Sequence, residues 1–188
     1  MGGLDSRFIL SPSNPENIAE YITSLTTIGT PHRGSPIADV LYPWKKGETS
    51  LVVTGLVKSW EQIFLDELGI SINGLRDLTT ECGNNFDRKT IDHDNVKYFW
   101  TAGIGRSDVI KTSLLLLASY EYIKLVNDED NDGAVPISSA IHGTAIGQPW
   151  FGDHLDQVGH NLDNLPNGTP PAFDYLAKYD EIIATVSL

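Results

Sequence analysis

The sequence predicts an α/β fold, a parallel β-sheet flanked by helices. Two short apolar segments, residues 24–28 and 96–100, stop close to Gly29 and Gly103, as buried parallel strands do. Helical hydrophobic patterns precede, separate and follow these segments, and such alternation is typical of α/β domains. Of the 188 residues 40% are hydrophobic, enough for one sizeable core, so we expect a single domain over residues 1–188.

The elements outside the strands are expected to be helical. Residues 2–10 should form the first helix, ended by Pro12 and Pro15, because proline removes a hydrogen-bond donor and restricts the residue before it. Residues 17–22 add a further helical turn ahead of the first strand. Apolar side chains recur at helical spacing in the C-terminal tail, residues 166–188, and predict a helix that closes the sheet.

A long connection, residues 35–95, separates the two strands and exceeds the length of an ordinary crossover. Its apolar residues recur at helical spacing: Ile37, Val40, Leu41, Leu56, Trp60, Ile63, Phe64, Leu68, Leu75 and Leu78. The pattern predicts amphipathic helices that form a cap. Two interpretations stay open, namely helices packed as ordinary core and a mobile lid that exposes an apolar face to lipid.

Composition excludes several classes of partner. The net charge of −12, without a cluster of lysines and arginines, argues against binding to nucleic acid or to an anionic membrane surface. The longest apolar run, residues 114–118, is far shorter than the roughly 20 residues of a membrane-spanning helix. Cys82 is the only cysteine, so no internal disulfide forms, and Met1 does not begin a signal peptide. These features slightly favour an intracellular protein, whereas a secreted one stays open if residues before Met1 have been lost.

Asp132 is the strongest candidate for a catalytic acid. It lies in the tight turn Asn131-Asp132-Gly133, which holds a carboxylate in a fixed place. A catalytic acid needs such placement because it keeps a histidine in one tautomer and stabilises the protonated ring. His154 follows in the chain and is the candidate general base.

A calcium loop competes for the same segment. The pattern Asp128-x-Asp130-x-Asp132-Gly133 matches the start of an EF-hand loop. That loop requires a bidentate glutamate at its twelfth position, where this chain has Ser139. The second half of the motif therefore fails, although a calcium-binding module built on residues 128–132 stays open.

Several segments together resemble a known family. Met1-Gly2 matches the two residues that follow the serine in the nucleophile elbow Gly-x-Ser-x-Gly. Residues 25–35 (LTTIGTPHRGS), 131–135 (NDGAV) and 153–156 (DHLD) then occur in the order and at roughly the separations seen in lipases. The chain thus resembles the triacylglycerol lipase family of the α/β-hydrolase fold, meaning bacterial true lipases and fungal lipase-like relatives, from Met1 to about Asp163. The resemblance implies an incomplete α/β-hydrolase fold, the C-terminal part of one domain.

The resemblance implies ester hydrolysis by a Ser-Asp-His triad. His154 would act as base and then acid, Asp132 would orient it, and the backbone N–H of Met1 would help to hold the oxyanion. The nucleophilic serine and the strands before it would precede Met1, since no Gly-x-Ser-x-Gly occurs in the chain. The isolated chain is therefore expected to be inactive. His32 matches a histidine of the family's strand-end loop, for which a structural role is expected, while His93, His142 and His160 match no catalytic position.

The resemblance implies no required cofactor. Its bacterial members imply a structural calcium ion, whereas in a fungal-type relative without the ion Asp156 would cap a helix or form a salt bridge. Asp156, two residues after His154, matches a calcium ligand of the bacterial lipases, and Asp108 would be the second carboxylate ligand. Backbone carbonyls near His160 and Asn164 would complete the site.

Two classes of function follow. The first is a lipase-like hydrolase whose substrate is an acyl ester or lipid, with lipid-interface contact through the cap and the missing N-terminal half as a further partner. The second is a non-catalytic remnant, either a lipid-binding protein or a partner subunit, which would explain the absent serine directly.

Overall fold

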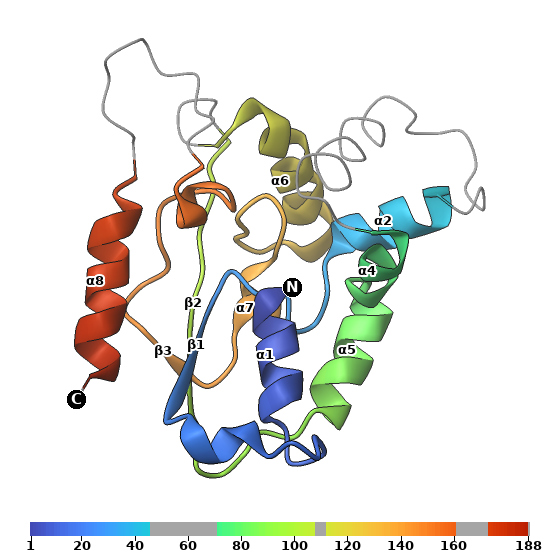
Figure 1. Cartoon of the computed structure of the whole chain (residues 1–188). Coiled ribbons are helices and arrows are strands. Elements are labelled where there is room, and N and C mark those ends of the chain that lie inside the picture. Colours follow the sequence, from blue (N-terminus) through green and yellow to red (C-terminus); the bar gives the residue numbers. More distant parts are fainter. Residues whose placement is uncertain (46–70, 108–111, 161–172, 188) are drawn as a thin grey trace.

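The computed structural model describes residues 1–45, 71–107, 112–160 and 173–187. Its described strands form a three-stranded parallel sheet in the order β1-β2-β3 (Figure 1). The strands are β1 (Ser24–Ile28), β2 (Lys97–Thr101) and β3 (Thr144–Ala145). The predicted α/β class is confirmed. The first strand has the predicted bounds, the second begins one residue later, and the two-residue β3 was not predicted.

Helices surround this sheet. They are α1 (Gly2–Leu10), η1 (Ile18–Tyr21), α2 (Pro36–Lys45), α4 (Ile72–Asp77), α5 (Thr80–Lys89), α6 (Leu114–Asn127), α7 (Ile137–Ala140), η3 (Asp156–Val158) and α8 (Tyr175–Val186). Side-chain oxygens of Ser71, Thr79, Ser113 and Asp174 accept a backbone N–H in the first turn of α4, α5, α6 and α8, which fixes where these helices start. The predicted helices at 2–10 and 17–22 are confirmed, whereas the helices α6 and α7 were not predicted.

The main hydrophobic core joins the segment after β1 to α6. Ile37, Leu41 and Leu75 lie in the same buried cluster as Leu116 and Ile123, and each of the five side chains is at most 1% exposed. The helices α2 and α4 therefore contribute side chains to this core. Whether residues 35–95 form a cap that moves as a lid stays a prediction. The remaining predicted cap residues, Leu56, Trp60, Ile63, Phe64 and Leu68, lie outside the described residues.

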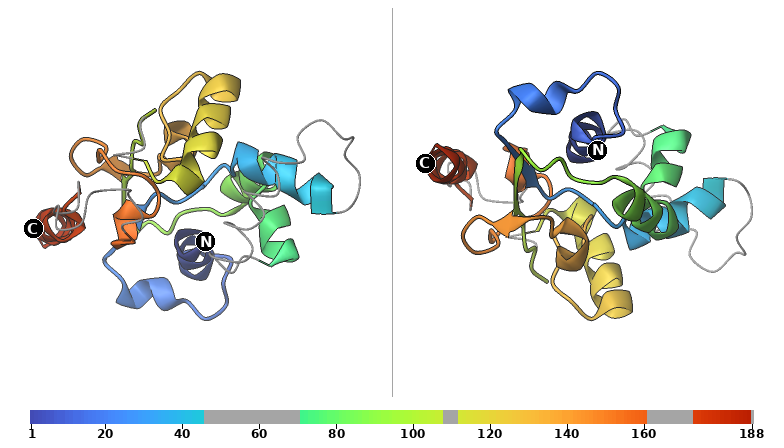
Figure 2. Two further views of the ribbon diagram at one scale, coloured as in Figure 1. Left: turned by 90° about the horizontal axis from the view of Figure 1, so that it is seen from above. Right: turned by 90° about the horizontal axis from the view of Figure 1, so that it is seen from below.

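A second buried cluster attaches the C-terminal helix. Ile182 of α8 packs with Ile146 and Trp150, and Ile28 and Phe99 of the sheet contact this cluster. The helix lies on one side of the sheet, while α2, α4 and α5 lie on the other (Figures 1 and 2). The predicted closing helix is thus confirmed. No helix in the described ranges combines the length and the apolar character needed to cross a membrane.

A buried polar cluster fixes α1 against the loop after β1. Arg7 is 3% exposed, and its guanidinium donates to Asp87 Oδ1 at 2.8 Å and lies 3.2 Å from His32 Nδ1. Arginine can only donate, so Nδ1 accepts and the Nε2–H of His32 donates to Thr27 Oγ1 at 3.1 Å. Burial, with the positive charge of Arg7, lowers the pKa of His32 to about 2. These contacts agree with the structural role expected for His32.

His32→Gln is expected to remove part of the acid sensitivity of folding. The fold keeps His32 neutral, so the unfolded chain binds more protons between about pH 6.5 and pH 2, and the free energy of unfolding falls as pH falls through that window. Protonation of His32 then accounts for about 2 kcal/mol of the loss between about pH 7 and 5. Urea unfolding at both pH values, with exposed His160→Gln as control, measures the difference. Equal losses in wild type and His32→Gln would contradict this assignment.

Candidate active site

The expected catalytic residues meet at the carboxyl edge of the sheet, where open α/β folds bind their ligands. Asp132 lies in the connection from α6 to α7, and His154 precedes η3. Met1 precedes the first residue of α1 at the same edge, beside the loop after β1 (Figure 1). The close contact between Gly3 of α1 and the side chain of Thr30 in that loop fixes this position. The fold thus gathers three segments that are far apart in the sequence.

The Asp132 carboxylate is held by its own turn. Its Oδ1 accepts the backbone N–H of Ala134 at 2.9 Å and of Val135 at 2.7 Å. Gly133 has a φ of +89°, which allows the chain to turn back, and Asn131 Oδ1 accepts the Gly133 N–H at 2.9 Å. The side chain of Asp132 is 1% exposed. The predicted tight turn is therefore present, and it buries the acid in one orientation.

His154 is paired with this acid. Its Nδ1 lies 2.8 Å from Asp132 Oδ2, and its backbone N–H donates to the Asp132 carbonyl at 2.8 Å. Because the carboxylate accepts, Nδ1 carries the proton, and the lone pair of the neutral ring lies on Nε2. Nε2 has no hydrogen-bond partner among the described residues, and the side chain is 28% exposed. This is the tautomer and the access that a general base requires.

The electrostatics favour a charged imidazole. Burial alone would lower the pKa of His154, but the charge of Asp132 and its hydrogen bond outweigh burial and raise the pKa above its ordinary value. An acid that stabilises the imidazolium lowers the cost of taking a proton from a nucleophile. The pair can therefore act as an orienting acid and a general base.

The loop that presents His154 is itself fixed by a buried carboxylate. Asp153 Oδ1 accepts the N–H groups of Leu155 and Asp156 at 2.8 and 3.0 Å, and Oδ2 accepts the Ser113 N–H at 2.6 Å. Burial raises the pKa of Asp153. The carboxylate ties the start of η3 to the start of α6, so it holds the His154 loop.

Sequence reasoning missed Gln157, one turn beyond His154. Its Nε2 donates to Asp132 Oδ2 at 2.7 Å, and its side chain is almost fully buried. A glutamine in a polar segment belongs to no motif that could be recognised in the sequence. The one available signal was its spacing of three residues from His154, which places both side chains on the same side of a helical turn.

Met1, the expected oxyanion donor, lies near the histidine. Its carbonyl accepts the N–H groups of Leu4 and Asp5 at 2.8 and 3.1 Å, so Met1 caps α1. The Met1 nitrogen lies within electrostatic range of His154. The structure brings Met1 and His154 into one neighbourhood, and the oxyanion role stays a prediction.

The expected calcium ligands are described only in part. Asp156 is buried, and its Oδ2 accepts the backbone N–H of Asp153 at 2.9 Å. His160 is exposed, and its backbone N–H donates to the Leu155 carbonyl at 3.0 Å. Asp108 and Asn164 lie outside the described residues. Within the described ranges, no three His, Cys, Asp or Glu side chains gather as metal ligands would.

The alternative calcium loop at residues 128–132 stays a prediction, and two of its carboxylates have separate partners in the structure. Asp130 pairs with Lys124 at 3.1 Å on the surface, whereas the Asp132 carboxylate is buried against His154. Asp128 ends α6 in the left-handed conformation, with a φ of +52°. The carboxylates of Asp130 and Asp132 therefore face different partners.

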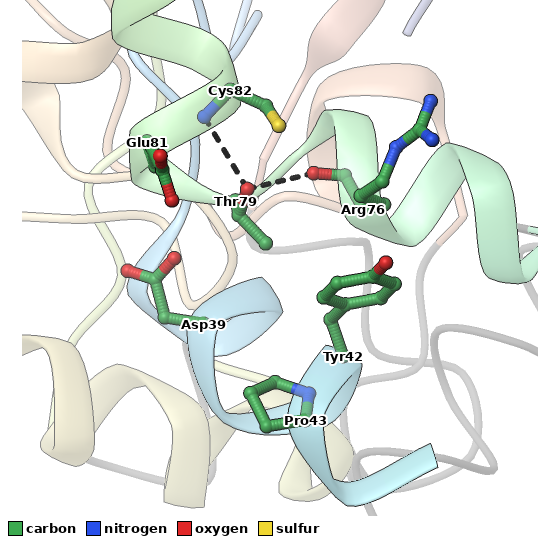
Figure 3. Close-up of a pocket in the computed structure, with 7 residues that line it drawn as sticks. All are labelled: Asp39, Tyr42, Pro43, Arg76, Thr79, Glu81 and Cys82. Atoms are coloured by element: carbon green, nitrogen blue, oxygen red, sulfur yellow. Dashed lines mark hydrogen bonds between the residues drawn. The ribbon is translucent and has the colours of Figure 1, made fainter. Parts of the chain in front are cut away.

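A cavity of about 400 Å³ lies apart from this pair, between α2, α4 and α5 (Figure 3). Its lining residues are Asp39, Tyr42, Pro43, Arg76, Thr79, Glu81 and Cys82. Their polar groups are largely engaged with one another or with neighbours: Asp39 accepts from the N–H and hydroxyl of Thr80, and Arg76 pairs with Asp77. None of the described lining residues is a histidine.

Comparison with known proteins finds lipases. No protein-family model matches the chain. The chain is 32% identical over 162 residues to triacylglycerol lipase 2 of Saccharomyces cerevisiae, an alignment that covers 84% of this chain and 43% of the yeast protein. The chain spans about half the length of the curated relatives that it matches, between 43% and 64%.

Solved lipase structures match the fold. The crystal structure of Bacillus licheniformis lipase BlEst2 in its propeptide form matches with a TM-score of 0.56 and 25% identity, over 92% of this chain and 36% of that one. Staphylococcus hyicus lipase matches with a TM-score of 0.63 and 18% identity, over 99% of this chain and 67% of that one. The predicted fold class, part of an α/β-hydrolase, is confirmed.

Proposed function

We propose that this chain, a distant homologue of the triacylglycerol lipases, supplies the acid and the base of a carboxylic ester hydrolase. One observation carries the proposal: His154 Nδ1 lies 2.8 Å from a buried Asp132 carboxylate, while Nε2 stays available. This is the acid–base half of a Ser-His-Asp triad. Since the yeast relative is a triacylglycerol lipase, the proposed substrates are acyl esters of lipids.

In the proposed reaction, a serine outside the printed sequence attacks the ester carbonyl. His154 Nε2 takes the serine proton and then gives it to the leaving alcohol, while Asp132 stabilises the imidazolium. The Met1 N–H and a second backbone N–H bind the oxyanion of the tetrahedral intermediate. Water, activated by the same histidine, then releases the fatty acid and restores the serine.

The position of α1 supports a serine directly before Met1. The helix begins at the carboxyl edge of the sheet, and the Met1 nitrogen lies within electrostatic range of His154. A serine joined to Met1 would therefore lie next to the general base. Its oxyanion would face the N-terminus of a helix, where unpaired N–H groups and the helix dipole favour negative charge.

The proposal is tested by labelling the protein from its native source with a fluorophosphonate probe and mapping the modified peptide. We expect the label on a serine that directly precedes Met1, or on a copurifying polypeptide that supplies that serine, together with hydrolysis of 4-nitrophenyl butyrate. An unlabelled species with the mass of this chain alone, without hydrolysis, would reject the proposal. That result would favour the non-catalytic remnant, either lipid-binding or a partner subunit.

A structural calcium ion belongs to the same proposal. Asp156 lies in the loop that presents His154, so an ion held there with Asp108 would stabilise that loop. Saturating calcium is expected to raise the Tm by about 5 °C relative to a chelator, and Asp156→Asn should abolish the rise. Asp130→Asn is the matched control and should leave it unchanged. The reverse pattern would instead assign calcium to residues 128–132.

A further inference from the structure

The Asp132 carboxylate accepts hydrogen bonds from four described donors. Oδ1 takes two backbone N–H groups of its own turn, those of Ala134 and Val135. Oδ2 takes His154 Nδ1 at 2.8 Å and Gln157 Nε2 at 2.7 Å. Gln157 is therefore the one described side chain besides His154 that donates to Asp132 Oδ2.

The amide of Gln157 packs between the chain segments that follow β1 and β2. A Cβ added at Gly29, after β1, would lie 2.6 Å from Gln157 Oε1, and a Cβ added at Gly103, after β2, would lie 2.6 Å from Nε2. Nε2 also lies 3.3 Å from the Asp153 carbonyl. Glycine at both positions leaves just enough room for the amide, so Gln157 has little freedom to move away from Asp132.

The orientation of the Gln157 amide, taken alone, destabilises the folded state. Gln157 Oε1 is buried and has no hydrogen-bond partner among the described residues. A buried unpaired acceptor destabilises a fold. Rotating the amide by 180° would place Oε1 against the Asp132 carboxylate, where two acceptors repel. The fold thus keeps an unpaired carbonyl oxygen in order to present an N–H donor to Asp132 Oδ2.

We propose that Gln157 is a positioning residue, which fixes the Asp132 carboxylate and through it the tautomer of His154. Without this donor, only the two N–H groups on Oδ1 restrain rotation about the Cβ–Cγ bond, and the hydrogen bond between Oδ2 and Nδ1 loosens. The neutral ring then also populates the tautomer with its proton on Nε2, which cannot accept a proton from a serine. The catalytic consequence rests on the proposed function, whereas the tautomer does not.

The test uses the full chain with ¹⁵N-labelled histidine, and the His154 signals are assigned from their loss in His154→Asn. At a pH where the ring is neutral, wild type is expected to show the Nδ1–H tautomer. Gln157→Met and the milder Gln157→Asn, which cannot reach Oδ2, should both gain the Nε2–H form. In the serine-containing hydrolase, kcat should fall about tenfold with KM unchanged. Ser139→Ala removes the hydrogen bond that the hydroxyl donates to the Gly34 carbonyl and the one that it accepts from the Arg33 N–H, and it is the control for lost stability alone.

The outcomes separate this inference from the proposed function. If the folded Gln157→Asn chain keeps the wild-type tautomer, the inference is wrong, whatever Gln157→Met does. A tautomer change equal to that in Ser139→Ala would also overturn it, because general loosening would then explain the effect. If both Gln157 variants shift the tautomer but no form of the protein hydrolyses esters, the positioning role stands and the proposed function fails.

Discussion

Asp132→Asn is expected to lower kcat of the hydrolase that contains this chain about 10⁴-fold, with little change in KM. Both carboxylate oxygens of Asp132 accept from donors, so either orientation of an asparagine amide would set its NH₂ group against an N–H. Where that NH₂ group faces the ring, it would donate to Nδ1 of His154 and select the tautomer that cannot act as a base. Steady-state hydrolysis of 4-nitrophenyl butyrate and of a triacylglycerol emulsion measures the loss.

Two further variants define this result. Asp130→Asn, two residues away on the surface, is the matched control and should retain full activity. His154→Ala should lose at least as much activity as Asp132→Asn, and the double variant should lose no more than His154→Ala, because the residues act as one unit. Additive losses, or near wild-type kcat in Asp132→Asn, would show that the pair does not perform the chemistry.

Gly83→Ala is expected to destabilise the fold by about 3 kcal/mol, although the same change inside a helix normally stabilises by about 1 kcal/mol. Gly83 lies in α5, where an added Cβ would overlap the backbone N of Gly34 and lie 2.5 Å from the carbonyl carbon of Arg33. These are backbone atoms of the loop after β1, and Gly34 has a φ of +81°. The loop cannot move aside without disturbing His32, so the overlap outweighs helix propensity.

Urea unfolding measures this effect at neutral pH. The control is Gly2→Ala in α1, where an added Cβ meets no atom within 4 Å. That variant should unfold at the same urea concentration as wild type or a slightly higher one. A Gly83→Ala protein as stable as Gly2→Ala would refute the close backbone packing of α5.

Local features of the sequence determined much of this fold. Apolar β-branched residues before a glycine located β1, and proline placement located the end of α1, because both signals act within a few residues of chain. The Asn131-Asp132-Gly133 turn predicted a fixed carboxylate for the same reason. The motif around His154 then identified this histidine as the partner of Asp132 through the resemblance to lipases. In the structure, His154 Nδ1 lies 2.8 Å from Asp132 Oδ2.

Other features were decided by tertiary structure alone. The sequence could not tell which partner the apolar face of α2 meets, since an amphipathic pattern fits any apolar partner, and only the packed chain places Ile37 in one buried cluster with Leu116. It also could not identify Gln157, whose contact with Asp132 spans 25 residues and depends on how two loops meet. Periodicity and turn chemistry are local and can be recognised in a sequence, whereas contacts between distant loops arise only when the whole chain packs.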